Sequence, residues 1–248
     1  MIIDKLGDLQ YAGKSSREAG LMIQTTSFAW QTPVYSSTLT QISGKSAAAI
    51  VPNNRYDNVA QAFPLRTVPG LNPVQLMRAH RAALDWLYKV TPDQYQKIEF
   101  TGVPNTYYLG IPSAVSAMTF VTDYATMSVT MSMPPFAYDT DGDVYQPIAE
   151  GQTFANDYDV TAPPLIHVTG NGNGSFELNG KTYKVVGVKG DLWLDCDNEV
   201  AYDSNNDALP NAVEFDDYAF PALVPGNNTF SNITGIRLEM KPHWRQLF

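Results

Sequence analysis

The chain has 248 residues, of which 44% are hydrophobic and 12% aromatic, so it can bury a real core and wholesale disorder is excluded. Its 16 basic and 25 acidic side chains give a formal charge of −9, which argues against a protein that grips nucleic-acid phosphates. Charged residues are only 17% of the chain, below the roughly 25% usual in globular proteins. Uncharged polar residues or another subunit must therefore cover much of the surface.

The N-terminal residues lack the basic start and apolar stretch of a signal peptide. No run of about 18 apolar residues predicts a membrane-spanning helix. The single cysteine, Cys196, excludes an internal disulfide and any multi-cysteine zinc site. We therefore expect a chain that folds in a reducing cytoplasm and does not insert into a membrane.

A segment rich in Ser, Thr, Gln and Asn covers residues 32–58 and includes the short apolar run 47–51. Its periodicity is too weak to predict a core of its own. Such a segment is either a mobile loop or an arm that packs on something else, and its low charge favours the arm.

One long helix is predicted over residues 73–89. Asn72 is a good N-cap, Pro73 suits the first helical position, and the pre-proline Thr91 ends the pattern. Helical spacing predicts one buried stripe with two neighbouring apolar positions. The expected stripe is Met77, Leu84, Leu87 and Tyr88, with Leu76 and Ala83 beside it.

The rest of the chain has the pattern of strands. Residues 126–133 alternate strictly, with Met127, Val129, Met131 and Met133 expected on the buried side. The charged turn at 139–143 suggests a boundary between domains 1–138 and 139–248. Beyond it, short strands are expected at 165–168, 175–178, 181–188, 191–195 and 233–240. Asn179-Gly180 predicts a type I′ hairpin. The fold class is mainly β with one main helix, and the C-terminal half is expected to be a β-sandwich or small barrel.

Motifs for ligand chemistry are incomplete. Gly13-Lys14-Ser15 and Gly44-Lys45-Ser46 lack the upstream glycine that a phosphate loop needs. Residues Asp139, Asp141, Asp143 and Glu150 have calcium-loop spacing, but Val144 replaces the required glycine, so an acidic turn is favoured over a calcium site. The three histidines, His80, His167 and His243, are too far apart for a metal-binding motif.

Catalytic patterns are equally weak. The like charges of Asp195 and Asp197 disfavour the thiolate of Cys196, and no serine lies in a nucleophile-elbow motif. A glycosidase pair could in principle arise among Asp191, Asp195, Glu199 and Glu214, although acidic pairs are common by chance in so acidic a chain. We therefore predict no catalytic residue, no metal and no cofactor.

Two tryptophans have different expected roles. Trp86 is expected to anchor the helix against the sheet. Trp193 alternates with Leu192 and Leu194, so its ring can point outward, where it would suit a sugar platform. This leaves open two alternatives: a carbohydrate-binding module for host cell-wall adhesion, and a glycoside hydrolase.

Four local sequences, in this order, are similar to one family. They are GKS at 13–15 with EAGL at 18–21; LDWL at 84–87 with YQKI at 95–98 and YYL at 107–109; GDLWLD at 190–195 with EVAY at 199–202; and FPALVPGNN at 220–228 with KPHWR at 241–245. Together they resemble the distal tail proteins (Dit) of long, flexible-tailed siphovirus phages of Gram-positive bacteria.

The resemblance implies an architecture. The N-terminal domain would be a β-sandwich-like tube module, and six copies would close into a ring with a central channel. A belt arm at about 32–62 would wrap the neighbouring subunit, with Tyr35, Ile50, Val51, Arg55 and Tyr56 as interface residues. The C-terminal domain would be a galectin-like β-sandwich.

The resemblance also implies a function. The protein would be a non-enzymatic baseplate hub at the distal end of the phage tail in the virion, assembled in the host bacterial cytoplasm. It would join the tail tube (major tail) protein to the tail-associated lysin or tail-fibre hub protein and to receptor-binding or baseplate proteins. DNA would pass through the channel without specific binding.

Overall fold

The structure is a computed structural model that describes residues 7–24, 28–88, 94–215 and 219–248. The chain forms two compact units, Met1–Ala137 with Leu247–Phe248, and Tyr138–Gln246. The expected boundary was between residues 138 and 139. In the structure it lies one residue earlier, and the last two residues return to the first unit.

The first unit is built on a sheet in which the strands follow the order β2-β1-β7-β8-β10-β6-β3, with β9 beside β10. Residues 107–110 of β8 pair with β7, whereas residues 111–115 pair with β10, so this one strand links two parts of the sheet. The strands are β1 (Leu9–Tyr11), β2 (Lys14–Ser15), β3 (Leu21–Ile23), β6 (Val59–Thr67), β7 (Gln96–Phe100), β8 (Val103–Val115), β9 (Thr119–Val121), β10 (Tyr124–Met133), β11 (Phe136–Asp139) and β19 (Arg245–Leu247).

Strand β10 alternates as expected. Met127, Val129, Met131 and Met133 are buried, and the Ser and Thr residues between them face the other side. The buried set packs in one hydrophobic core with residues of β6 such as Phe63. The prediction of a mainly β chain with one long helix is confirmed.

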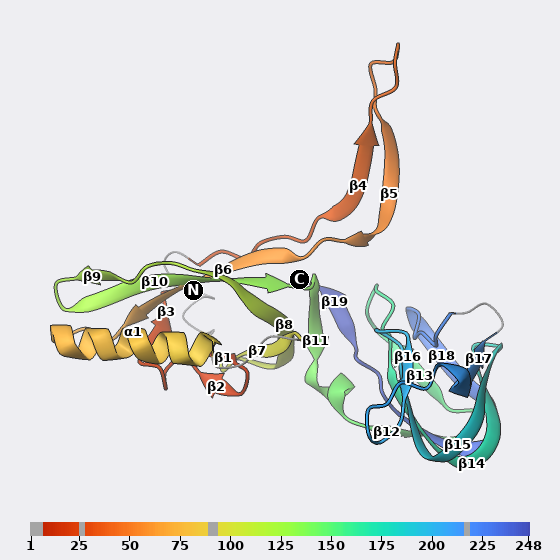
Figure 1. Ribbon diagram of the computed structural model, residues 1–248. Coiled ribbons are helices and arrows are strands. Elements are labelled where there is room, and N and C mark those ends of the chain that lie inside the picture. Colours follow the sequence, from red (N-terminus) through yellow and green to blue (C-terminus); the bar gives the residue numbers. More distant parts are fainter. Residues whose placement is uncertain (1–6, 25–27, 89–93, 216–218) are drawn as a thin grey trace. The chain divides into compact units, whose positions relative to one another are not determined.

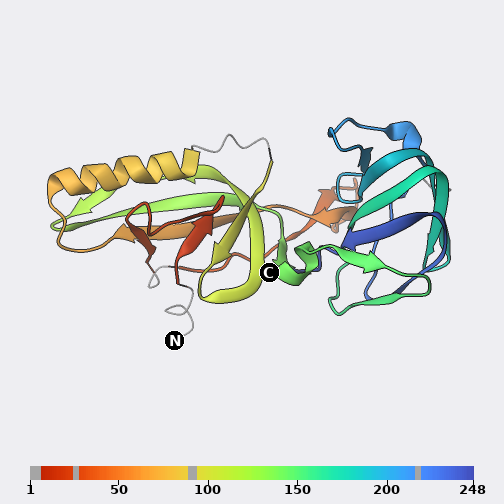
Figure 2. The ribbon, with the colours of Figure 1, turned by 90° about the horizontal axis from the view of Figure 1, so that it is seen from below.

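The helix α1 (Pro73–Tyr88) starts at a reciprocal cap. The Gln75 N–H donates to Asn72 Oδ1 at 3.0 Å, and the Asn72 N–H donates to Gln75 Oε1 at 2.9 Å. These bonds satisfy two backbone groups that a helix start would leave unpaired. Figures 1 and 2 show α1 running along the sheet of its own unit, roughly parallel to β10.

The expected buried stripe of α1 was wrong for most of its members. Met77 and Tyr88 are exposed and Leu84 is half-buried, while the buried side chains are Leu76, Ala83, Trp86 and Leu87. The helix has apolar residues on two faces, so spacing alone does not decide which face meets the sheet.

The indole of Trp86 fixes the buried face, because its ring meets Tyr11 edge to face at 6.4 Å and its Nε1–H donates to the Lys14 carbonyl at 3.2 Å. Trp86 therefore anchors the helix, as the sequence analysis expects.

A separate two-stranded sheet lies between β3 and β6 in the chain, formed by β4 (Tyr35–Thr40) and β5 (Ala49–Tyr56). The arm that we expected over 32–62 is therefore shorter, because residues 59–62 belong to β6. Gln61 is polar, as an arm residue would be, but it is buried: its side-chain amide accepts the Gln31 N–H and donates to the Ala29 carbonyl.

The second unit is one seven-stranded sheet with the order β12-β18-β14-β15-β16, in which β13 also pairs with β18 and β17 with β15. Of its three long strands, β15 and β18 each pair with different short strands at their two ends, whereas β14 lies between them and pairs with both at each of its ends. All three strands curve strongly (Figure 2). The strands are β12 (Gln146–Ile148), β13 (Thr153–Asn156), β14 (Leu165–Leu178), β15 (Lys181–Asp195), β16 (Val200–Tyr202), β17 (Val213–Phe215) and β18 (Gly226–Lys241).

Glycines bend the long strands without breaking them. The strands expected at 165–168 and 175–178 are one strand, β14, and those expected at 181–188 and 191–195 are one strand, β15. At the bend, β14 passes so close to β18 that a Cβ on Gly174 would lie 2.8 Å from the Thr234 carbonyl oxygen. The register of β14 also shifts between Gly172 and Gly174. The glycine-rich segment is therefore a bulged bend within a strand.

The hairpin between β14 and β15 has the predicted turn. Asn179 and Gly180 both have positive φ, at 54° and 80°, which is the backbone of a type I′ turn. The core of this unit is centred on Ile166, Phe176, Leu194 and Phe230.

Candidate assembly surface

The β4–β5 hairpin is held together by contacts within itself and its flanking residues (Figure 1). The Asp57 N–H donates to the Val34 carbonyl at 3.1 Å, and Asn53 Nδ2 donates to Ser36 Oγ at 3.0 Å. Neither strand pairs with another sheet among the described residues. Because a two-stranded hairpin is marginally stable in water on its own, this segment is a candidate for contact with another molecule.

The interface residues expected from the sequence all lie in this hairpin, but not on one face. Tyr35 and Tyr56 are opposite each other and their rings meet edge to face at 5.3 Å. Arg55 lies 3.6 Å from Asp57 in an exposed ion pair, which contributes little to stability.

Ile50 and Val51 are both exposed, yet they point to opposite faces because neighbouring residues of a strand alternate. Ile50 is opposite Leu39, and Val51 is opposite Thr38. Leu39 was not among the predicted interface residues. It is 65% exposed, and its neighbour Ile50 is 70% exposed. The Leu39–Ile50 pair therefore forms an exposed apolar patch on one face of the hairpin. Its signal in the sequence was a single leucine surrounded by polar residues.

Trp193 lies on the outward side of β15, as its alternation predicts, but neither face of its ring is open. His167 stacks on one side at 4.5 Å between ring centroids and Tyr202 lies parallel at 5.9 Å. The indole Nε1–H donates to the Tyr145 hydroxyl at 3.2 Å. A sugar platform needs an exposed aromatic face, so this geometry argues against that role.

His167 connects three strands. Its Nδ1 lies 2.8 Å from Glu239 Oε1 on β18, and its Nε2 lies 2.8 Å from Asp191 Oδ1 on β15. The two ring nitrogens thus join side chains of the two strands that flank β14. His167 therefore has a structural role as a cross-strand clamp, in keeping with the packed position expected for it.

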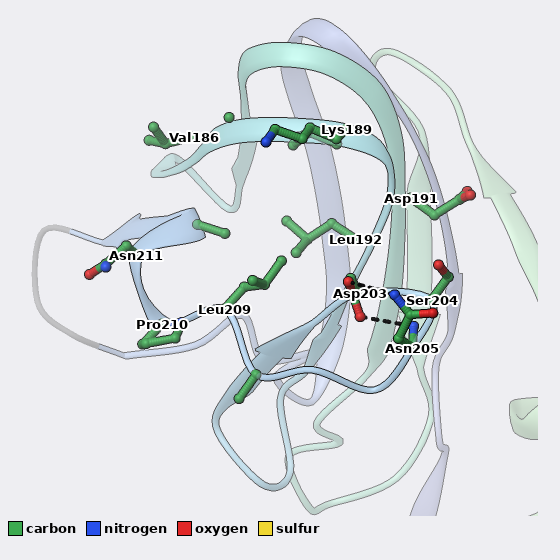
Figure 3. Close-up of a pocket in the computed structure, with 14 residues that line it drawn as sticks. Val186, Lys189, Asp191, Leu192, Asp203, Ser204, Asn205, Leu209, Pro210 and Asn211 are labelled. Carbon is green, nitrogen blue, oxygen red and sulfur yellow. Dashed lines mark hydrogen bonds between the residues drawn. The ribbon is translucent and has the colours of Figure 1, made fainter.

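A cavity of about 650 Å³ lies in the second unit between residues 186–192 of β15 and the loop 203–212 (Figure 3). Of the four carboxylates considered for a glycosidase pair, Asp191 alone lines it, and its carboxylate is bonded to His167. The other acid in the lining, Asp203, accepts the backbone N–H groups of Asn205 and Asp207, which lowers its pKa. Neither acid is placed for general acid catalysis.

The acidic turn does not form a metal site. Asp139 caps the following 3₁₀ turn by accepting the Asp141 N–H, and Asp143 forms an ion pair with Lys241 at 3.2 Å. Glu150 instead accepts the backbone N–H groups of Asn232 and Ile233. Within the described ranges, no three His, Cys, Asp or Glu side chains converge to hold a metal ion.

Cys196 is buried, and desolvation raises the pKa of its thiol well above the usual value, with further contributions from Asp195, Asp197 and Glu199. The effect of the like charges on this pKa is predictable from the sequence, whereas the larger effect of burial is not. Such a thiol is a poor nucleophile at neutral pH.

No helix in the part of the chain that the structure describes has the length and apolar character needed to cross a lipid bilayer.

The chain thus has two β-rich units, and the first unit carries one long helix and a hairpin whose strands pair only with each other. Solved structures with the same arrangement exist. No protein-family model matches the chain, and no curated protein matches it. The crystal structure of phage SPP1 Dit, described as a paradigm of the hub adsorption apparatus in phages that infect Gram-positive bacteria, matches 97% of this chain and 98% of its own, with a TM-score of 0.69 and 16% identity.

Two structures of the phage P2 baseplate in its activated conformation are also similar. The one with Sr covers 92% of both chains at 9% identity and a TM-score of 0.48, and the one with Ca covers the same shares at 8% identity and 0.46. The SPP1 likeness spans both units and shows that the chain has the fold of a Dit protein. The resemblance indicated by the sequence motifs is thereby confirmed at the level of fold.

Proposed function

We propose that this protein is a structural hub of a phage tail tip. The observation that carries the proposal is the likeness to SPP1 Dit, which extends over nearly the full length of both chains and includes both units. The short sequence motifs alone would not support this proposal, since each is weak, but the two-unit fold indicates the same class of protein as the motifs do. The proposed role is non-enzymatic because SPP1 Dit is described as a hub of an adsorption apparatus.

In this proposal six copies form a ring around a channel. A closed head-to-tail ring needs two different complementary patches on each subunit. The β4–β5 hairpin supplies one patch, with the Leu39–Ile50 pair on one face and Val51 on the other. The low fraction of charged residues is in keeping with surfaces that become covered on assembly.

The ring would sit at the distal end of the tail. It would join the tail tube protein to the tail-associated lysin or fibre hub protein and to receptor-binding or baseplate proteins, after assembly in the host cytoplasm. Six copies of a chain with charge −9 carry −54, so acidic groups that face the channel would repel DNA phosphates. Such repulsion lets a genome slide through the ring.

The test is the mass of the purified protein by light scattering on a sizing column, with electron images of the same peak. Six copies of 27.3 kDa predict about 164 kDa and a ring with an open centre. A monomer at every concentration would contradict a ring that closes unaided.

Glycan binding is the competing function, and the enclosed ring of Trp193 gives it no support. A cell-wall glycan array probed with the wild type and with Trp193→Ala separates the two functions. A strong signal that Trp193→Ala abolishes would favour adhesion by the second unit.

A further inference from the structure

Helix α1 has a second apolar stripe that the first unit leaves uncovered. Val74, Met77, Leu84 and Tyr88 recur at spacings of three, seven and four residues, so they share one side of the helix. Three of them are well exposed, with Val74 at 59%, Met77 at 68% and Tyr88 at 57%. We call these four residues the outer stripe.

The outer stripe is not an ordinary solvent-facing helix surface. A helix that packs on one side usually carries mainly polar residues on the other, whereas the exposed side of α1 carries an apolar stripe next to the charged side chains of Arg78, Arg81 and Asp85. The buried side already uses Leu76, Ala83 and Trp86. The stripe residues Val74, Met77 and Leu84, together with these three charged residues, line a surface hollow of about 570 Å³. Exposed apolar side chains with a charged rim around a hollow are typical of a surface that contacts a second partner.

The β4–β5 hairpin also has apolar side chains that the first unit leaves uncovered. Its Leu39–Ile50 pair is highly exposed, and the hairpin has no partner strand outside itself within the described residues. Its dimensions also match, because six residues of β4 extend about 20 Å at roughly 3.3 Å each. The outer stripe runs about 21 Å from Val74 to Tyr88 at roughly 1.5 Å per residue.

We propose that the Leu39–Ile50 face of the hairpin docks on the outer stripe of α1 in a second copy of this chain. This inference rests on the proposed ring and names its second patch. A head-to-tail ring requires that the surface receiving the hairpin be different from the hairpin itself. The outer stripe includes Met77, which at 68% is as exposed as any large apolar side chain of the first unit's described residues outside the hairpin. Docking covers both apolar surfaces in one contact.

The test is oxidative crosslinking between Ile50→Cys and Met77→Cys in a Cys196→Ser background. We expect a ladder of covalent oligomers up to the hexamer on a non-reducing gel, because each copy contributes one cysteine to each neighbour. Either cysteine alone should give no ladder. Val51→Cys with Met77→Cys is the matched control, since Val51 points to the opposite hairpin face, and its crosslinking should be several-fold weaker.

The outcomes separate this contact from the ring itself. A ring seen by light scattering whose Ile50→Cys/Met77→Cys variant gives no ladder overturns the docking and leaves the hub proposal standing. A disulfide that forms only within single copies also overturns the docking, because the hairpin would then fold back on its own helix. A preparation with no ring and no ladder contradicts both.

A second measurement uses charge instead of cysteine. Met77→Asp should lower the fraction of protein in the ring several-fold while the thermal unfolding temperature stays near that of the wild type, because Met77 is exposed in the single chain. Val144→Asp, an equally exposed apolar position in the second unit, is the matched control and should leave the ring intact. A Met77→Asp protein that still assembles fully would overturn the docking.

Discussion

At the scale of single residues, His243 couples the second unit to pH. Its ring is largely buried, and this desolvation lowers its pKa below the usual value near 6.5. Asp143 and Asp197 oppose that shift and Lys241 adds to it. His243 also has a positive φ of 53°, and its N–H donates to the Gly142 carbonyl at 2.8 Å. One residue thus combines an unusual backbone with a ring that resists protonation.

The consequence is a loss of stability in acid. With the folded-state pKa below the unfolded one, the unfolded chain binds the proton first as the pH falls below about 6.5. His243 therefore destabilises the second unit progressively from that pH downward, and contributes nothing at alkaline pH. His243→Asn keeps a residue that tolerates positive φ and removes the titration.

We expect the urea midpoint of His243→Asn to fall less than that of the wild type between neutral and mildly acidic pH. Comparison at alkaline pH, where the ring is neutral in both states, sets the baseline. Identical pH profiles for the two proteins would show that another group controls acid stability.

At the scale of elements, the start of α1 depends on the pair Asn72 and Gln75. The two reciprocal bonds at 3.0 and 2.9 Å satisfy backbone and side-chain groups together. We expect Asn72→Ala to lower the free energy of unfolding by about 1 kcal/mol, whereas Asn72→Ser should change it much less because serine is also a good N-cap. Denaturant unfolding of both variants measures this. Equal losses for alanine and serine would mean that the side chain is not acting as a cap.

The bend of β14 provides a second test at this scale. A Cβ on Gly174 would lie 2.8 Å from the Thr234 carbonyl oxygen, whereas one on Gly170 would lie 3.1 Å from the nearest carbonyl oxygen, that of Gly235. We expect Gly174→Ala to cost about 1–3 kcal/mol of stability, with Gly170→Ala milder, because overpacking forces the strands apart. Thermal unfolding of the two variants compares them. A milder effect at Gly174 would mean that β14 and β18 can separate freely there.

Some elements follow from sequence and others do not, for physical reasons. The alternation in β10, the Asn72 cap and the Asn179-Gly180 turn are local, so sequence patterns predict them. The buried face of α1 was predicted wrongly because two apolar stripes compete and a distant contact, from Trp86 to Lys14, decides between them. The bends of β14 and β15 were read as breaks, since strand pairing through a bulge depends on residues tens of positions away.

Only part of the candidate assembly surface could be predicted from the sequence. Residues of the hairpin were expected at an interface, but the partner of Ile50 across the hairpin, Leu39, is one apolar residue in a polar segment. Three residues of the outer stripe, Met77, Leu84 and Tyr88, were predicted to be buried. Exposure of an apolar side chain is a property of the folded unit, so no pattern in the sequence distinguishes it from burial.

At the scale of the whole molecule, charge sets how the assembled protein meets DNA. The proposed ring of six copies would carry a formal charge of −54, whereas proteins that bind DNA electrostatically neutralise its phosphates with Lys and Arg and so release counterions. We therefore expect no change in the fluorescence anisotropy of a labelled DNA duplex when the purified ring is added, even at about 50 mM salt, where electrostatic binding is strong. Saturable binding that weakens steeply with added salt would contradict a channel that repels the genome.

The position of β18 in its sheet also governs how the second unit can fold. This strand lies between β12 and β14, and it pairs residues as distant as His167 and Glu239. Contacts of such long range make folding slow, because a large loop must close before they form. During synthesis the β14–β15 hairpin emerges well before β18, and until then the edge of β14 that later receives β18 is unpaired. The nascent chain thus passes through a stage with an open strand edge, to which chaperones can bind.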